Sequence, residues 1–195
     1  MIQSEKFKEA INLFDEANKN DPNKEVYQGQ EYPKELLYAQ RMTERLNSFD
    51  ENAGEALQLS VRCQHIQRWE IPRDQYDMNR VGYLKWRNDL KLFHADRAGE
   101  IMKSVGYDDD TIDTVKFLLQ KKQLKKNEMT QTLEDVICLV FLEYYFERFA
   151  EKYDEEKLID ILRKTWNKMS DNGQKAAQLL NLSDRSTQLV SKALS

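Results

Sequence analysis

Apolar residues recur at every third or fourth position along most of the chain, the spacing that places them on one face of an α-helix. Residues 4–19 are the first such stretch, and Ser4 precedes it as a helix cap. Residues 21–31 are polar and predict a loop. Pro33 then suits the first turn of a second helix, which runs to about residue 48. The chain therefore begins as a series of amphipathic helices.

The same periodicity continues through the rest of the sequence. A third helix is expected after Asn52, because Leu57, Val61, His65 and Trp69 recur every four residues and share one face. Later helices are expected over about residues 80–105, from residue 108 to the lysine-rich run that ends at 126, and over 132–152 and 154–194. Within residues 132–152, the seven apolar residues from Val136 to Leu142 predict a helix that is buried nearly all round.

Composition agrees with an all-α fold. The chain has only 6 Gly and 3 Pro in 195 residues, which argues against an architecture of strands and turns. We expect a single-domain bundle of about eight helices over residues 1–195, with a core over about 32–152. The helix at 4–19 and the helices at 154–194 would pack on that core.

Targeting and redox signals point to a cytoplasmic protein. No window approaches eighteen apolar residues, and the first residues do not form a signal peptide, so no membrane association is expected. Cys63 and Cys138 both lie in helical patterns, and two cysteines do not form a disulfide framework. They are expected to be buried thiols.

Charge is distributed unevenly along the chain. The formal net charge is −4, yet residues 62–91 contain seven basic and four acidic residues and carry +3. A basic segment in an acidic protein favours a small anionic or phosphorylated ligand near that segment. A solvated surface without a partner is an equally consistent interpretation. Nucleic acid is disfavoured as a partner, since its binding depends on neutralising many phosphates.

Four side chains from four separate predicted helices are candidate metal ligands. Glu35, His65, His94 and Asp135 each occupy an inward position of their helical pattern. Two imidazoles and two carboxylates suit zinc, manganese or iron. A structural network in which the histidines hydrogen-bond the carboxylates is the alternative interpretation.

A second group of residues could hold the anion. Basic side chains would bind phosphate, and an aromatic ring of Trp69 or Trp86 would stack on a base or a sugar. The candidates for this anion or substrate site are Arg41, Gln64, Arg68, Trp69, Arg73, Lys85, Trp86 and Arg87.

The order of these residues resembles a known superfamily over about residues 32–152. The segment from Gln64 to Arg68 lines up with a His-Asp pair, His94 with a later histidine and Asp135 with a late aspartate. Glu35 falls near the first histidine of that pattern. The resemblance is to the HD-domain metal-dependent phosphohydrolases, and it implies an HD-like core and a divalent metal. Glutamine and histidine stand in this chain where the pattern has its His-Asp pair.

A second resemblance covers nearly the whole chain. It rests on five long motifs, at residues 36–42, 62–73, 82–87, 133–136 and 158–166. Through these motifs the chain is similar to an uncharacterised family described only as a domain of unknown function, number four-two-zero-two. This resemblance implies no activity.

Three functions are consistent with the sequence. The first is a metal-dependent hydrolase of a phosphorylated small molecule such as a nucleotide, in which the ion activates a water molecule. The second is a non-catalytic module that binds a nucleotide, RNA or an acidic partner through its basic aromatic segment. The third is a structural protein whose arginine, tryptophan and glutamate side chains only tie helices together.

Overall fold

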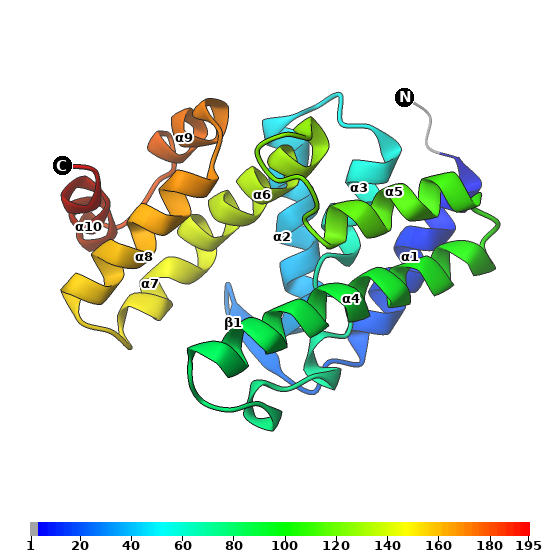
Figure 1. Cartoon of the computed structure of the whole chain (residues 1–195), viewed down its shortest axis with the longest axis horizontal. Helices are drawn as coiled ribbons and strands as arrows, with labels where there is room; N and C mark the ends of the chain where they lie inside the picture. The colour runs from blue at the N-terminus through cyan, green and yellow to red at the C-terminus, as the bar shows by residue number, and fades with distance from the viewer. Residues whose placement is uncertain (1–3) are drawn as a thin grey trace. The chain divides into compact units, whose positions relative to one another are not determined.

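The structure, a computed structural model, describes residues 4–195 and is built almost entirely of helices (Figure 1). The all-α prediction is confirmed. Within the described residues there are ten α-helices and one two-stranded hairpin: α1 Glu5–Lys19, β1 Lys24–Tyr27, β2 Gln30–Pro33, α2 Lys34–Phe49, α3 Glu55–Cys63, α4 Arg80–Ser104, α5 Asp109–Leu119, α6 Glu128–Val140, α7 Phe146–Ala150, α8 Glu155–Lys168, α9 Asp171–Gln178 and α10 Asp184–Leu194.

The chain divides into two compact units. Unit 1 ends at Lys122 and holds α1 to α5 with the hairpin, and unit 2 covers Gln123–Ser195 and holds α6 to α10. The expectation that all 195 residues form one domain stays a prediction. None of the helices in residues 4–195 combines the length and the apolar composition that crossing a lipid bilayer requires.

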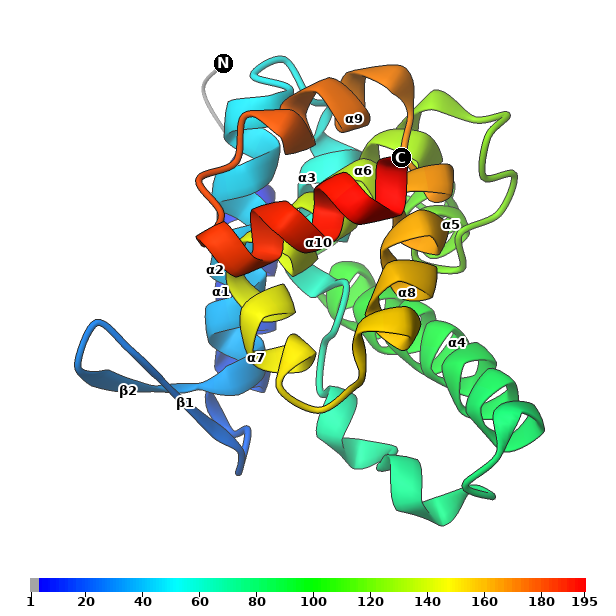
Figure 2. The same cartoon turned by 90° about the vertical axis from the view of Figure 1, so that its left-hand side faces the viewer.

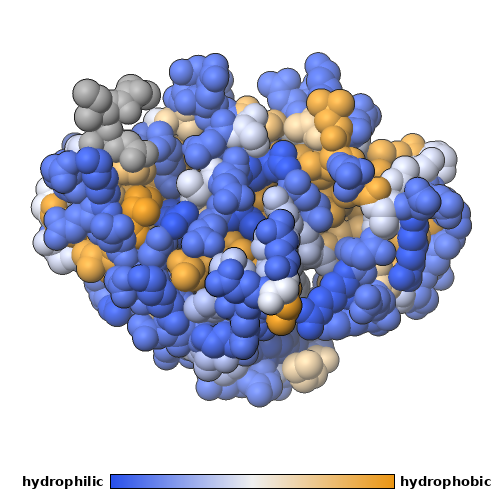
Figure 3. All heavy atoms as spheres, turned by 180° about the vertical axis from the view of Figure 1, so that it is seen from behind, coloured by the Kyte–Doolittle hydropathy of each residue, from blue (hydrophilic) through white to orange (hydrophobic). Residues whose placement is uncertain are grey.

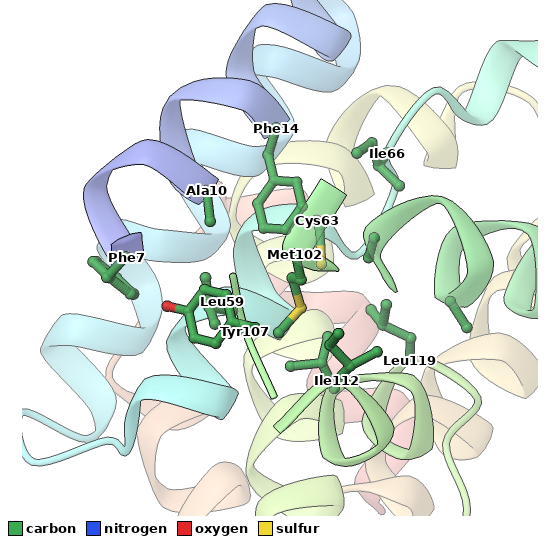
Figure 4. Close-up of a cluster of buried hydrophobic side chains, with 13 residues drawn as sticks. Phe7, Ala10, Phe14, Leu59, Cys63, Ile66, Met102, Tyr107, Ile112 and Leu119 are labelled. Atoms are coloured by element: carbon green, nitrogen blue, oxygen red, sulfur yellow. The ribbon is translucent and has the colours of Figure 1, made fainter. Parts of the chain in front are cut away.

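The core of unit 1 is formed by apolar side chains from α1, α3, α4 and α5. Figure 4 shows Phe14, Cys63 and Met102 pointing into the same interior from three of these helices. Phe14, Cys63 and Met102 are fully buried. Each large apolar side chain buried here contributes about 1.5–3 kcal/mol relative to exposure. Cys63 and Cys138 are both free and buried, which confirms the prediction that they are buried thiols.

Helix ends in unit 1 follow the capping signals in the sequence. The Ser4 hydroxyl accepts a hydrogen bond from the Phe7 amide at 3.2 Å, so the predicted cap of α1 is confirmed. Asn79 caps α4 in the same way through the Gly82 amide. Gly106 follows α4 with φ +83°, a left-handed conformation that glycine adopts without a steric penalty.

Residues 24–33 form a β-hairpin where the sequence analysis predicted a loop, so that expectation was wrong. The strands β1 and β2 pair antiparallel, with Tyr27 opposite Gln30. Gln28 and Gly29 form the two-residue turn with φ +50° and +78°. Positive φ at both central residues is what a type I′ hairpin turn requires, but glutamine is not the residue that usually signals it.

Unit 2 has its own apolar interior. Its α6 continues through a π-helical turn, Phe141–Tyr145, into α7. Val136 and Leu139 of α6 are fully buried, as the unbroken apolar run predicted. Helices α8 and α10 lie side by side in Figure 2, and Arg163 donates a hydrogen bond from its Nε to the Ala193 carbonyl. Figure 3 shows a face of the molecule on which hydrophilic residues predominate and apolar ones are scattered.

Candidate functional site

The turn that follows α3 carries four of the predicted site residues, Gln64, His65, Arg68 and Trp69. Helix α3 ends at Cys63, so the prediction that the helix continues to Trp69 was wrong. Gln67 has φ +48°, in the left-handed region that an α-helix excludes. Its amide donates to Asn18 Oδ1 at 2.9 Å, and its side-chain oxygen accepts from Arg97 Nε at 2.5 Å. Contacts with α1 and α4 therefore fix this turn.

Glu35 and His65 contact each other. Glu35 lies in the first turn of α2, is only 6 % exposed, and its amide donates to Asp21 Oδ2 at 2.9 Å. The Nδ1 atom of His65 is 3.2 Å from Glu35 Oε2. Tyr38 stacks on the His65 ring, with ring centres 4.2 Å apart and planes 16° apart. The carboxylate and the tyrosine together orient the imidazole.

His94 lies beside His65. It projects from α4 and is 4 % exposed. Its Nδ1 donates a hydrogen bond to the Ile66 carbonyl oxygen at 2.8 Å. A carbonyl only accepts, so Nδ1 carries the proton and Nε2 has a free lone pair. That Nε2 atom is buried and has no hydrogen-bond partner in the part of the chain that the structure describes. The two imidazole ring centres are 5.8 Å apart.

Burial and neighbouring cations govern the charge of these groups. Burial lowers the pKa of both histidines well below its usual value, and Arg68 and Arg87 lower the pKa of each further. Both imidazoles are therefore neutral near pH 7. Burial raises the pKa of Glu35 to about 7, although the charge of Arg68 acts in the opposite direction. The site thus has more positive than negative charge at neutral pH.

Arg68 is held between Glu35 and Trp86. Its Nε is 3.9 Å from Glu35 Oε1, and its guanidinium carbon lies 4.7 Å from the centre of the Trp86 ring. The Trp86 indole N–H donates to the Ile71 carbonyl at 2.8 Å, which fixes the ring. Trp86 therefore supports Arg68 and contacts the backbone of the loop before α4.

Three other predicted anion-binding residues make structural contacts. Arg41 is buried, pairs with Glu25 at 2.6 Å and lies over the Tyr27 ring, so it ties the hairpin to α2. Arg73 donates to backbone carbonyls at the loop preceding α4, including that of Tyr76 at 2.9 Å. Gln64 accepts a hydrogen bond from the Tyr38 hydroxyl at 2.8 Å.

The remaining predicted anion-binding residues are Trp69, Lys85 and Arg87. Trp69 is half-buried and Lys85 is exposed. Arg87 is half-buried and forms no ion pair with any residue in 4–195. It is nevertheless near enough to His65, Arg68 and His94 to lower the pKa of all three. Arg87 is therefore a guanidinium of the site whose charge is not neutralised by a partner.

Asp135, the fourth predicted metal ligand, lies in unit 2 and binds the start of α9. Its carboxylate accepts hydrogen bonds from the Ser170 amide at 2.8 Å, the Ser170 hydroxyl at 2.5 Å and the Gln131 side chain at 3.0 Å. A Cβ atom at Gly173 would come within 2.6 Å of this carboxylate, so a larger residue there would displace it. A metal-binding role for Asp135 stays a prediction.

Three of the four predicted ligands, Glu35, His65 and His94, therefore lie together in unit 1. Glu35 contacts Nδ1 of His65, which is the orienting role that carboxylates take around metal-bound histidines. No group of three or more His, Cys, Asp or Glu side chains within residues 4–195 is arranged to hold a metal ion. A metal site at these residues stays a prediction.

Sequence reasoning missed the residues that support the site. Asp21, Asn18 and Gln67 hold the segments that carry Glu35 and His65, and none of the three was a candidate in the sequence analysis. Tyr38 lies one helical turn after Glu35, so the shared face of α2 was a signal for its position. The contacts of Asn18 and Gln67 had no signal in the sequence.

Comparison with known proteins gives a family. The family described as "Domain of unknown function (DUF4202)" matches residues 8–190, which is nearly the whole chain. The chain belongs to this family. All of the candidate residues from Glu35 to Asp135 lie inside the matched span of the DUF4202 family. No curated protein and no solved structure matches the chain. The resemblance to the HD-domain superfamily stays a prediction.

Proposed function

We propose that the protein binds the phosphate group of a small phosphorylated molecule, such as a nucleotide, in unit 1. The site is the set Glu35, His65, Arg68, Arg87 and His94, here named the histidine–arginine cluster. The observation that carries the proposal is Arg87, a half-buried guanidinium that has no ion pair within the described residues. Removing a charge from water is unfavourable unless an opposite charge compensates it. A bound phosphate would provide that charge.

The charges of the other members support the same proposal. Arg68 contacts one carboxylate, Glu35, and only at 3.9 Å. The raised pKa of Glu35, about 7, leaves that carboxyl only partly ionised at neutral pH. Two guanidinium groups therefore face less than one full negative charge. Guanidinium groups bind phosphate through paired N–H donors, and the Trp86 ring beneath Arg68 restricts its motion before the ligand arrives.

Binding is tested by isothermal titration calorimetry with inorganic phosphate and pyrophosphate. Arg87→Ala should weaken binding by about tenfold or more, since it removes a charge-assisted contact. Arg80→Ala is the matched control, because it removes the same charge from an exposed position on the same helix. Binding by Arg80→Ala should change by less than about twofold. Equal affinity of wild type and Arg87→Ala would exclude the proposed site.

Hydrolysis of the bound phosphate ester by a divalent zinc, manganese or iron ion is the second candidate. The observation that favours it is that the Nδ1 atom of each imidazole is hydrogen-bonded to a protein oxygen, a carboxyl oxygen for His65 and a carbonyl oxygen for His94, as in metal-bound histidines. A bound ion would activate a water molecule and neutralise charge on the phosphate. Phosphate release from a panel of nucleotides and phosphomonoesters, with each ion added, tests this. Turnover should be lost in His65→Ala. If the wild-type protein shows no turnover with any of the ions, hydrolysis is excluded and only the phosphate-binding function remains.

A further inference from the structure

We infer that His65 and His94 form a two-histidine metal site that the phosphate ligand itself completes, so that a divalent ion and phosphate bind tightly only together. The inference rests on the proposed phosphate-binding function. It assigns to the metal the Nε2 atoms of both rings, and to Glu35 and the Ile66 carbonyl the role of orienting those rings. It differs from a four-ligand site formed by the protein alone.

The separation of the two ring centres matches that of two imidazoles on one ion. Each ring uses Nδ1 in a hydrogen bond within the protein, at 3.2 Å for His65 and 2.8 Å for His94, which leaves Nε2 for an external partner. A zinc–nitrogen bond is about 2.0–2.1 Å, so two imidazoles on one ion have ring centres about 5–6 Å apart. The observed separation is 5.8 Å. The unpartnered, buried Nε2 of His94 is the atom that such an ion would satisfy.

The protein supplies too few ligands to hold the ion by itself. Catalytic zinc sites have three protein ligands, whereas no group of three His, Cys, Asp or Glu is arranged for a metal within the described residues. Glu35 Oε2 contacts His65 Nδ1, and Glu35 Oε1 lies 3.9 Å from Arg68 Nε. At least two coordination positions would therefore belong to water or to the ligand.

Electrostatics makes the two ligands depend on each other. The positive charges of Arg68 and Arg87 both act on His65 and His94, and they would repel an ion that arrives without an anion. A phosphate group neutralises these charges and contributes oxygen ligands to the ion. Conversely, the ion adds positive charge beside the phosphate. Each partner is thus expected to raise the affinity of the other by the same factor, as thermodynamic linkage requires.

The test measures both affinities with Mn²⁺ and methylphosphonate, a phosphate analogue that is not hydrolysed. Electron paramagnetic resonance gives the concentration of free Mn²⁺, and calorimetry gives the binding of methylphosphonate. We expect the Mn²⁺ affinity to rise about tenfold or more at saturating methylphosphonate, with a reciprocal rise of equal size. His94→Gln should abolish this coupling, and its side-chain amide can still donate to the Ile66 carbonyl. Arg80→Ala, with its exposed side chain, should keep the coupling.

The outcomes separate this inference from the proposed function. Methylphosphonate that binds equally with and without Mn²⁺ would overturn the shared metal site and leave the phosphate-binding function standing. Mn²⁺ that binds tightly alone, or coupling that persists in His94→Gln, would also overturn the inference. If methylphosphonate binds under neither condition, the proposed function itself fails. Melting temperatures of all variants identify any that is unfolded, and His94→Asn then replaces His94→Gln.

Discussion

Replacing Asp21 by alanine would remove the acceptor that holds the start of α2, and with it the backbone that positions Glu35. Asp21 is 1 % exposed and lies between α1 and the hairpin. One oxygen accepts from the Glu35 amide at 2.9 Å, and the other accepts from the Asn23 amide at 2.8 Å. Pro33, which precedes α2, makes no side-chain cap. Asp21, fourteen residues before Glu35 in the sequence, therefore caps the start of α2.

The size of the effect follows from these two bonds. A buried N–H that loses its partner costs about 1–3 kcal/mol, and this applies in full to Glu35, which is buried. Asn23 is exposed, so water can partly replace the lost bond and the cost there is about 0.5–1.5 kcal/mol. Asp21→Ala should therefore lower the free energy of unfolding by about 2–4 kcal/mol. Asp21→Asn, which keeps one acceptor oxygen, should lower it by less.

Urea denaturation followed by circular dichroism and by tryptophan fluorescence measures this difference. Asp113→Ala is the matched control, because Asp113 is an exposed carboxylate on α5 of the same unit. It should change the free energy of unfolding by less than about 0.5 kcal/mol. If the free energy of unfolding of Asp21→Ala also lies within about 1 kcal/mol of the wild-type value, Asp21 does not stabilise the start of α2 as the structure indicates.

Three further predictions concern stability. Arg62 donates to both carboxylate oxygens of Asp15, at 2.7 and 2.5 Å. A double-mutant cycle with alanine at both positions should therefore give a coupling free energy of about 1–3 kcal/mol. Denaturant unfolding measures this coupling, and a value near zero would contradict the prediction. Phe14→Ala should cost about 3–5 kcal/mol in the same assay, because its side chain is fully buried. Hydrogen bonds from the Ser183 and Ser186 hydroxyls lower the pKa of Glu147. The stabilisation that ionised Glu147 gives the folded state is therefore present at neutral pH and lost as pH falls through the lowered pKa. Glu147→Gln should for that reason reduce the drop in melting temperature between pH 7 and pH 3.

The helices could be predicted because their apolar spacing and caps are local. The Ser4 cap and the buried run in α6 both appear where the pattern placed them. The hairpin at residues 24–33 was missed, because its turn uses glutamine in a conformation that local sequence seldom predicts. The end of α3 was also missed, since contacts from Asn18 override the helical periodicity.

The candidate site was predicted in part. Periodicity placed Glu35, His65 and His94 on inward faces, and the structure brings all three together. The same reasoning placed Asp135 inward, but its hydrogen bonds to Ser170 depend on a residue thirty-five positions away. Among the basic residues, sequence could not distinguish Arg41, which pairs with Glu25, from Arg87, which lacks an ion pair in residues 4–195.

The sequence by itself determined an all-α protein with two inward histidines and a basic segment, because helical periodicity and residue chemistry are local properties. Only the tertiary structure decided what those side chains do. Atoms distant in sequence, such as Glu35 Oε2 and the Ile66 carbonyl oxygen, bind Nδ1 of each histidine and leave its Nε2 for another partner. Burial then keeps both rings neutral beside Arg68 and Arg87. Burial and hydrogen-bond partners arise from packing, so no reading of single positions could supply them.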